Sequence, residues 1–151
     1  MDVKLLTPFL DGMKALLEQF SITDIKRGRL ERKANLNTAS DITVIIGFQK
    51  DLRGNVAYSM SDQTASNVVS LMMGGVPMNE ENIGSAICEF VNMISGYTVS
   101  SFYKMNLKIE NTPPTMISGK KLFLMISRVE TIMLEIITPL GPIEVNIGIE
   151  Q

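Results

Sequence analysis

Short apolar runs separated by structure-breaking residues fill the last third of the chain, and they restrict the possible fold more than any other feature. Most of the runs are rich in β-branched residues, and all are too short for a typical helix, so they favour strands. Pro, Gly and polar residues break them at 112–114, 118–119 and 139–142. Short turns join antiparallel neighbours. The expected strands are Leu107–Glu110, Leu122–Val129, Thr131–Thr138 and Ile143–Ile149.

The first half of the chain adds further strand signals. Thr43–Phe48 is β-branched and mostly apolar, Asp51–Asn55 has turn residues, and large side chains alternate over Val56–Met60. These segments predict a hairpin. Ile22–Lys33 is crowded with charges and holds few large apolar residues. We expect a weak edge strand there, with a turn at Gly28.

Three segments have helical periodicity. The first begins with Thr7, a predicted N-cap followed by Pro8, and ends near Phe20. The second is capped by Ser61, presents a core face of small and branched apolar residues, and stops before 74–77.

The third and longest helix is expected to be capped by Asn79 and to run to about Lys104. Helices grouped between runs of short strands predict an α+β fold with helices packed on a largely antiparallel sheet. At 151 residues, a single domain spanning 1–151 is expected. A chain of this size needs neither disulfides nor a structural metal.

The composition excludes several classes of function. The chain has no His and only Cys88, which excludes Ser-His and Cys-His triads, intrachain disulfides and the usual zinc sites. The net charge is −2, so no general basic field favours nucleic acid or an anionic membrane. No apolar run reaches the roughly 18 residues of a spanning helix, and Met1–Asp11 does not resemble a secretory signal. We therefore expect a cytoplasmic protein.

The third helix has two distinct sides. At 100° per residue, one set of apolar and Thr side chains falls between roughly 140° and 220° and is expected to pack on the sheet. A second set falls on the opposite side, within roughly 60°, and is expected to face outward. The inward set is Ile87, Phe90, Ile94 and Thr98, and the outward stripe is Ser85, Glu89, Asn92 and Gly96. Spacing alone leaves open whether this stripe is only a solvated helix face.

The residues around the stripe resemble the signature helix of the CheC/CheX/FliY phosphatases, in particular CheX. The family pattern is Ser/Asp-x3-Glu-x2-Asn with a Pro about 21 residues later, and Pro113 lies 21 residues after Asn92. The stretch Thr112–Gly119 is similar to a CheX loop, and Gly54–Ser61 running into Ser70–Gly75 is similar to an upstream family motif. The resemblance covers roughly residues 43–119 and implies a CheC-like fold.

The resemblance implies a phosphatase that removes the aspartyl phosphate of a CheY-like response regulator. Asn92 is then expected to position the attacking water and Glu89 to dock the regulator, with Ser85 and Gly96 in the docking surface. The resemblance implies no cofactor or metal of its own, because Mg²⁺ belongs to the regulator. One departure matters: a second Glu-x2-Asn on the first helix is replaced by Ala15 and Glu18, which implies a single active stripe.

Other interpretations remain open at this level. The same stripe suits a non-catalytic module that binds a regulator or belongs to a flagellar switch. A third hypothesis, weaker than these two, is nucleic-acid binding through Lys26–Lys33. The same segment could steer an acidic regulator, although a solvated strand edge explains it better. Ile143–Ile149 has one charge and no Pro, so we expect it to be a poorly protected edge strand. Together with the resemblance to CheX, that strand predicts a homodimer.

Overall fold

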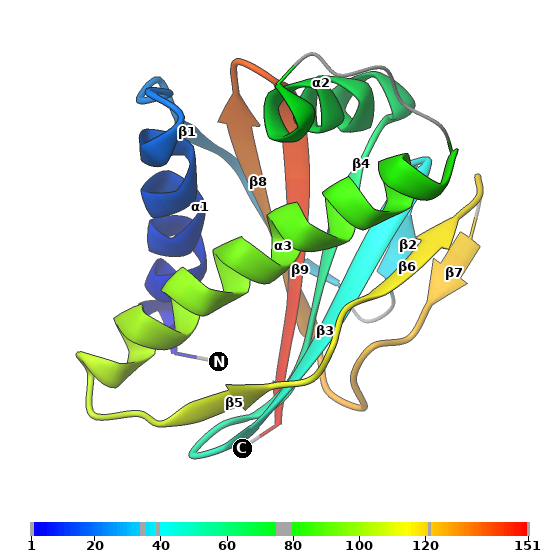
Figure 1. Ribbon diagram of the computed structural model, residues 1–151. Coiled ribbons are helices and arrows are strands. Elements are labelled where there is room, and N and C mark those ends of the chain that lie inside the picture. Colours follow the sequence, from blue (N-terminus) through cyan, green and yellow to red (C-terminus); the bar gives the residue numbers. More distant parts are fainter. Residues whose placement is uncertain (1, 34–35, 39, 75–79, 121, 151) are drawn as a thin grey trace.

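An antiparallel sheet with helices on one face forms the framework of the computed structural model (Figure 1). The structure describes residues 2–33, 36–38, 40–74, 80–120 and 122–150. The described helices are the 3-10 helix Val3–Leu5 and the α-helices α1 (Thr7–Gln19), α2 (Asp62–Met73) and α3 (Glu80–Tyr103). This arrangement confirms the predicted α+β fold.

The main sheet has the order β1-β8-β9-β4-β3, and both β5 and β6 pair with the outer edge of β3. All of these pairings are antiparallel. β2 and β7 form a separate two-stranded sheet. The strands are β1 (Lys26–Lys33), β2 (Leu36–Thr38), β3 (Ile42–Lys50), β4 (Arg53–Met60), β5 (Ile109–Asn111), β6 (Thr115–Ser118), β7 (Leu122–Leu124), β8 (Thr131–Thr138) and β9 (Gly141–Glu150).

Local chemistry accounts for the ends of α2. The Ser61 hydroxyl accepts a hydrogen bond of 3.1 Å from the Thr64 backbone N–H, which satisfies one of the free donors of the first turn. Gly74 follows the helix in the left-handed conformation, with φ of 60°, where glycine has no steric cost. Both predicted ends are confirmed. The predicted cap of α3, Asn79, lies outside the described residues.

The start of α1 differs from the prediction by one residue. Leu6 holds the N-cap position and makes no side-chain cap, while Thr7 is already helical. The reason is the 3-10 helix that precedes α1. It leads directly into α1, because the Phe9 N–H donates to the Leu6 carbonyl at 3.1 Å. The Thr7 cap is therefore wrong, but Pro8 still lies in the first turn, where its missing donor costs nothing.

Apolar side chains of the three helices and one face of the sheet form the core. Phe9 of α1 meets Phe102 of α3 edge to face, with ring centroids 5.5 Å apart. Tyr58 of β4 is fully buried beneath α3, and its burial raises the pKa of the phenol. The largest fully buried side chains include Phe9, Met13, Leu16, Leu17, Ile46, Tyr58, Met60, Ile87, Phe90, Ile94 and Phe102.

The final strand is not an edge. β9 lies between β8 and β4 and pairs with both along most of its length, so the prediction of an exposed terminal edge strand is wrong. Its polar face is covered instead of solvated, because a β carbon on Gly148 would lie 2.5 Å from Ser127 Cβ. Asn146 on the same face is fully buried. The edges of the sheet are β1 on one side and β5 with β6 on the other.

Two other sequence predictions need correction, and two short strands are absent from the sequence predictions. The expected strand Leu122–Val129 is shorter in the structure, where only β7 forms. After β7 the chain crosses the sheet face that points away from the helices. Asn55 Nδ2 holds it there by donating to the Ile126 carbonyl at 2.6 Å. Gly28 lies within β1 at a register irregularity rather than in a turn. β2 and β6 were not predicted, because each has at most four residues and pairs only with a distant segment.

Candidate functional site

The inward side of α3 holds this helix firmly on the sheet. Ile87, Phe90 and Ile94 have no exposed surface, and Thr98 is 5% exposed. The predicted buried side is therefore confirmed. A helix seated on such a packed face cannot roll without opening the core, so the backbone of its other face keeps a fixed position.

The outward stripe lies on the free side of the same helix. Ser85, Glu89, Asn92 and Gly96 are all exposed, as the helical spacing predicts. Figure 1 shows α3 crossing in front of the sheet, with no described element over its outer side. The stripe thus presents one carboxylate and one amide to a possible partner, three residues apart on a rigid support.

Gly96 has no structural role in the described packing. A β carbon added there would meet nothing within 4 Å. Within a helix, Gly costs roughly 0.5–1 kcal/mol relative to Ala. Gly12 of α1 is different, because a β carbon there would lie 2.8 Å from the backbone carbonyl oxygen of Ile94. Only Gly12 is required by contact between the two helices.

A shallow hollow adjoins the stripe on the side facing α1, and the spacing of residues along the chain does not predict it. Its lining includes Met93, Gly96, Tyr97 and Ser100 of α3 together with Gln19 of α1. Gln19 Nε2 donates a hydrogen bond to the Tyr97 hydroxyl. Gln19 and Tyr97 are 78 positions apart in the chain, so no local spacing could have indicated this contact.

The first helix does not reproduce the stripe. Ala15 is half-buried and Glu18 is exposed. Glu18 lines a different hollow with Lys14, Ile22, Thr23 and Ile25. No carboxylate and amide pair stands at the family spacing here, so a single stripe remains the prediction.

The loop with Pro113 is fixed to the sheet edge. The Gly47 backbone N–H donates to Thr112 Oγ1 at 2.8 Å, and the Thr112 N–H donates to the Gly47 carbonyl at 2.8 Å. The two prolines lie between β5 and β6, which pair with successive parts of β3. These contacts support a structural role for the loop, in shaping the change from one short strand to the next.

Other reactive groups are scarce near the stripe. Cys88 is half-buried, and this burial raises the pKa of its thiol, which disfavours a nucleophilic thiolate. Within the described ranges, no group of three or more acidic or Cys side chains is arranged to hold a metal ion. None of the described helices is both long and apolar enough to cross a membrane.

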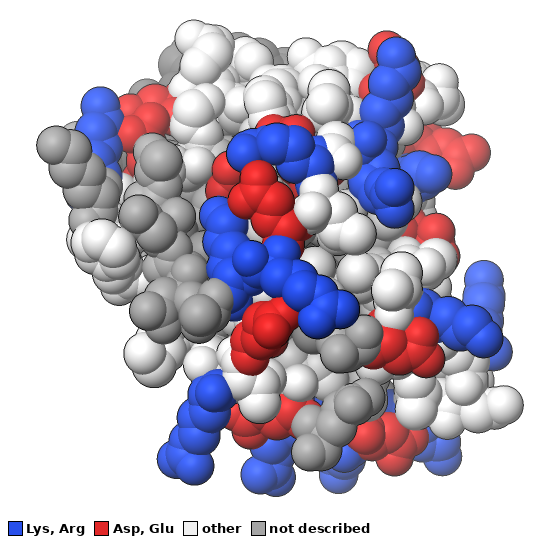
Figure 2. Space-filling model, turned by 180° about the vertical axis from the view of Figure 1, so that it is seen from behind, with Lys and Arg blue, Asp and Glu red and all other residues white. Residues whose placement is uncertain are grey.

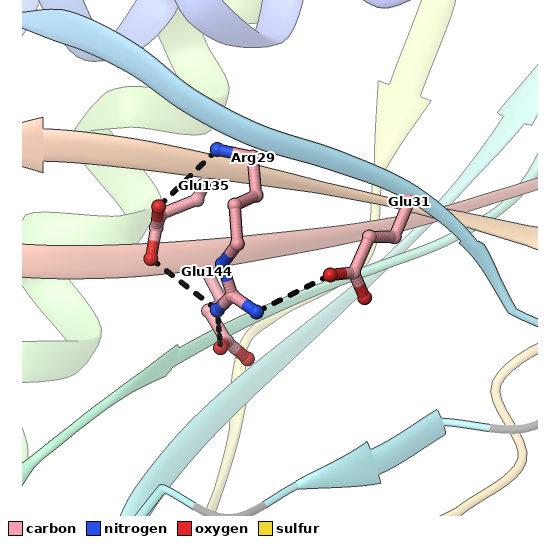
Figure 3. A network of polar contacts seen from close by, with 4 residues as sticks. All are labelled: Arg29, Glu31, Glu135 and Glu144. Carbon is pink, nitrogen blue, oxygen red and sulfur yellow. Dashed lines mark hydrogen bonds and ion pairs between the residues drawn. The ribbon is translucent and has the colours of Figure 1, made fainter.

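Two of the basic side chains in the predicted basic segment form ion pairs with acidic neighbours. Arg29 contacts Glu31 at 3.2 Å and both Glu135 and Glu144 at 3.4 Å (Figure 3). Arg32 contacts Glu130 at 3.3 Å. The hydrogen bond and charge of Glu135 raise the pKa of Arg29. Basic and acidic side chains alternate on the face seen in Figure 2. This mixture favours a solvated strand edge over a nucleic-acid surface.

Comparison with known proteins supports the expected family. The family model described as "Chemotaxis phosphatase CheX" matches residues 42–136, more than half of the chain. The chain is also 28% identical, over 124 residues, to the protein named CheY-P phosphatase CheX from Thermotoga maritima. That match covers 81% of this chain and 80% of the T. maritima protein.

Solved structures share the fold. A chemotaxis protein CheX from Desulfovibrio desulfuricans superposes with a TM-score of 0.88 at 21% identity, covering 98% of this chain and all of that one. CheX in a CheX-CheY-BeF3-Mg²⁺ complex from Borrelia burgdorferi gives a TM-score of 0.77 at 23% identity, covering 99% and 100%. At these identities the structures establish the fold, and the matched family model establishes membership. This chain belongs to the CheX family of chemotaxis phosphatases.

Proposed function

We propose that this chain hydrolyses the aspartyl phosphate of a CheY-like response regulator. Its family and the name of its T. maritima relative, CheY-P phosphatase CheX, support this activity. The observation that carries the proposal is the exposure of Glu89 and Asn92 on one side of α3 while the other side is fully buried. The helix can therefore enter a partner's pocket without losing its own packing.

The reaction makes modest chemical demands on the phosphatase. A bond forms between a water oxygen and phosphorus, while the bond from phosphorus to the aspartyl oxygen breaks and its electron pair leaves with the carboxylate. The water's proton passes to the released phosphate. We expect Mg²⁺ to come with the regulator, where it neutralises phosphoryl charge, and the B. burgdorferi complex contains CheX, CheY, BeF3 and Mg²⁺ together.

Asn92 suits the remaining task, which is to place the water opposite the leaving carboxylate. Its amide carbonyl can accept a hydrogen bond from the water, and its NH₂ can donate to a second group. Because the amide is neutral, it adds no negative charge beside the phosphoryl oxygens. A carboxylate at the same position would be repelled by those oxygens.

Glu89 suits a docking role. It lies three residues before Asn92 on the same exposed stripe, and its carboxylate can form an ion pair with a regulator Lys as the helix enters the pocket. Ser85 and Gly96 are small, so they allow close approach at either end of the stripe. The alternative function is a non-catalytic module that uses the same stripe only to bind.

Phosphate release separates the two functions. The protein is incubated with acyl-phosphate-labelled response regulators from its own organism, and release is compared with each regulator's spontaneous rate. Acceleration by catalytic amounts of the protein supports the phosphatase. Stable binding without acceleration supports the interaction module, and failure to bind any regulator contradicts both.

A homodimer also remains part of this proposal, on a basis other than β9. Phe123 in β7 and Met125 just after it are 75% and 76% exposed, the highest values among the large apolar side chains of the described residues. A second copy of the chain covering them would remove this surface from water. Light scattering at micromolar concentration is expected to give a mass near twice 16.7 kDa, and a monomer would contradict the dimer. We place the protein in the cytoplasm, together with its regulator.

A further inference from the structure

The hollow beside the stripe is large enough to receive a side chain. Its volume is about 310 Å³, and it is widely open to solvent. The Met93 side chain and the Tyr97 ring provide apolar lining, and both residues are half-buried. An apolar side chain laid over these two residues would therefore lose contact with water on the side that faces them.

Two helices hold the walls of this hollow in place. The hydrogen bond from Gln19 to the Tyr97 hydroxyl joins the end of α1 to α3. Ser100 Oγ donates to the Gly96 carbonyl at 3.2 Å, so its side chain turns back toward the same helix. A preformed wall loses little side-chain entropy when a partner binds.

The position of the hollow relates it to the phosphatase stripe. Gly96 is four residues after Asn92, a rise of about 6 Å along the helix. A stable protein interface buries about 800 Å² on each partner, which is much more than Glu89 and Asn92 can supply. A regulator whose phosphorylated pocket receives Asn92 must therefore extend over neighbouring turns of α3.

Gly96 provides independent support. Its missing side chain is not required by any contact within the described structure, because the space above it is open. The glycine keeps the entrance from the stripe to the hollow free of a side chain. A partner lying on the stripe can therefore reach Met93 and Tyr97 over the bare backbone of this turn.

We propose that this hollow, formed by Met93, Gly96, Tyr97, Ser100 and Gln19, binds an apolar side chain of the regulator next to its phosphorylation site. The inference rests on the proposed function and deepens it, because it identifies a surface that selects among regulators. Met93 and Tyr97 contact the regulator directly. Gln19 is a positioning residue that acts through the Tyr97 ring. Regulators with a charged residue at the matching position bind less well.

The test separates affinity from turnover. Met93→Ala and Tyr97→Ala are expected to weaken binding of the phosphorylated regulator about tenfold, with kcat at saturating regulator within about twofold of the wild type. Gln19→Ala is expected to raise KM by a smaller factor and to leave kcat unchanged. Ser100→Leu fills the hollow from an exposed position without removing any apolar packing, and it is expected to weaken binding as well.

Tyr103→Ala provides a matched control. Tyr103 is also a tyrosine of α3, is 64% exposed and lines a different hollow, with Asp51, Asn106 and Lys108. It is expected to bind the regulator like the wild type. Melting temperatures of all variants are measured, and Ser100→Leu keeps the test valid if a half-buried replacement fails to fold.

The outcomes distinguish this inference from the proposed function. If the wild type hydrolyses the phosphorylated regulator, and Ser100→Leu and Tyr97→Ala bind the regulator with wild-type affinity, the proposed binding hollow is wrong. The proposed phosphatase activity is then unaffected. If these variants weaken regulator binding but the wild type does not hydrolyse the phosphate, the binding hollow is supported and the phosphatase activity is contradicted. Lost kcat at saturation with normal affinity would also overturn the hollow as a binding surface.

Discussion

Gly12 of α1 lies so close to Thr98 of α3 that a β carbon on residue 12 would come within 2.3 Å of Thr98 Oγ1. That oxygen is already committed to a hydrogen bond of 3.0 Å with the Ile94 carbonyl. The close contact determines how near α1 approaches α3. It therefore also determines whether Gln19, two turns later on α1, can reach Tyr97.

Gly12→Ala is expected to destabilise the fold. The added carbon must displace backbone as well as a side chain, and overpacking of this kind typically costs about 1–3 kcal/mol of unfolding free energy. Chemical denaturation measures the change. Gly96→Ala is the matched control and is expected to raise the unfolding free energy by about 0.5–1 kcal/mol, because its β carbon meets no atom. Equal effects at the two glycines would contradict the packing described here.

Asn92→Ala is expected to reduce the rate of dephosphorylation by at least about 10²-fold with little change in affinity. The replacement removes the group that positions water but little contact area. Single-turnover phosphate release at saturating regulator measures the rate, and binding is followed separately. Near-normal turnover would rule out the proposed role of this amide.

Glu89→Ala is expected to weaken regulator binding and to reduce the rate at limiting regulator. The proposed ion pair also predicts that wild-type affinity falls as salt increases, and that this salt dependence is smaller in the variant. Titrations at two ionic strengths provide the measurement. An unchanged affinity at low salt would show that Glu89 does not dock the regulator.

The first helix is expected to be catalytically silent. Lys14→Ala and Glu18→Ala replace exposed side chains on a helix that lacks the carboxylate and amide of the stripe. Turnover by both variants should equal that of the wild type. Glu89→Ala, measured in the same assay, is the positive control and is expected to show a reduced rate. A large reduction in rate in folded Glu18→Ala would reveal a second site.

Arg29→Ala is expected to lower the melting temperature. Glu135 and Glu144 are directly paired across β8 and β9, and Arg29 Nη2 lies 3.4 Å from a carboxylate oxygen of each. Without Arg29, two like charges would face each other in the sheet. Adding Glu144→Gln is expected to restore part of the loss. Arg27→Ala, on the same strand, should have little effect, and equal shifts for both arginines would contradict this account.

Local periodicity was sufficient to predict α3. Its apolar residues recur with the helical period, and the structure buries Ile87, Phe90 and Ile94 while exposing Glu89 and Asn92. The same reasoning found α2 with both of its ends. These features depend on residues within one or two turns of each other, so the sequence itself contains the required information. The resemblance to the family motif implies roles for Glu89 and Asn92 that periodicity does not provide, and those roles stay predictions.

The sequence by itself thus determined the α+β class, the helices, the hairpin and the exposed stripe, whereas tertiary structure decided the neighbours of each element. The alternating pattern of β9 fits an edge strand or a central one, and only the distant segment around Ser127, packed over Gly148, shows which face is covered. The Gln19–Tyr97 hydrogen bond likewise joins residues that share no local pattern. Strand order and helix contacts arise from pairing between remote segments, which compete to bury the same apolar surface, and no spacing along the chain records which pairing wins.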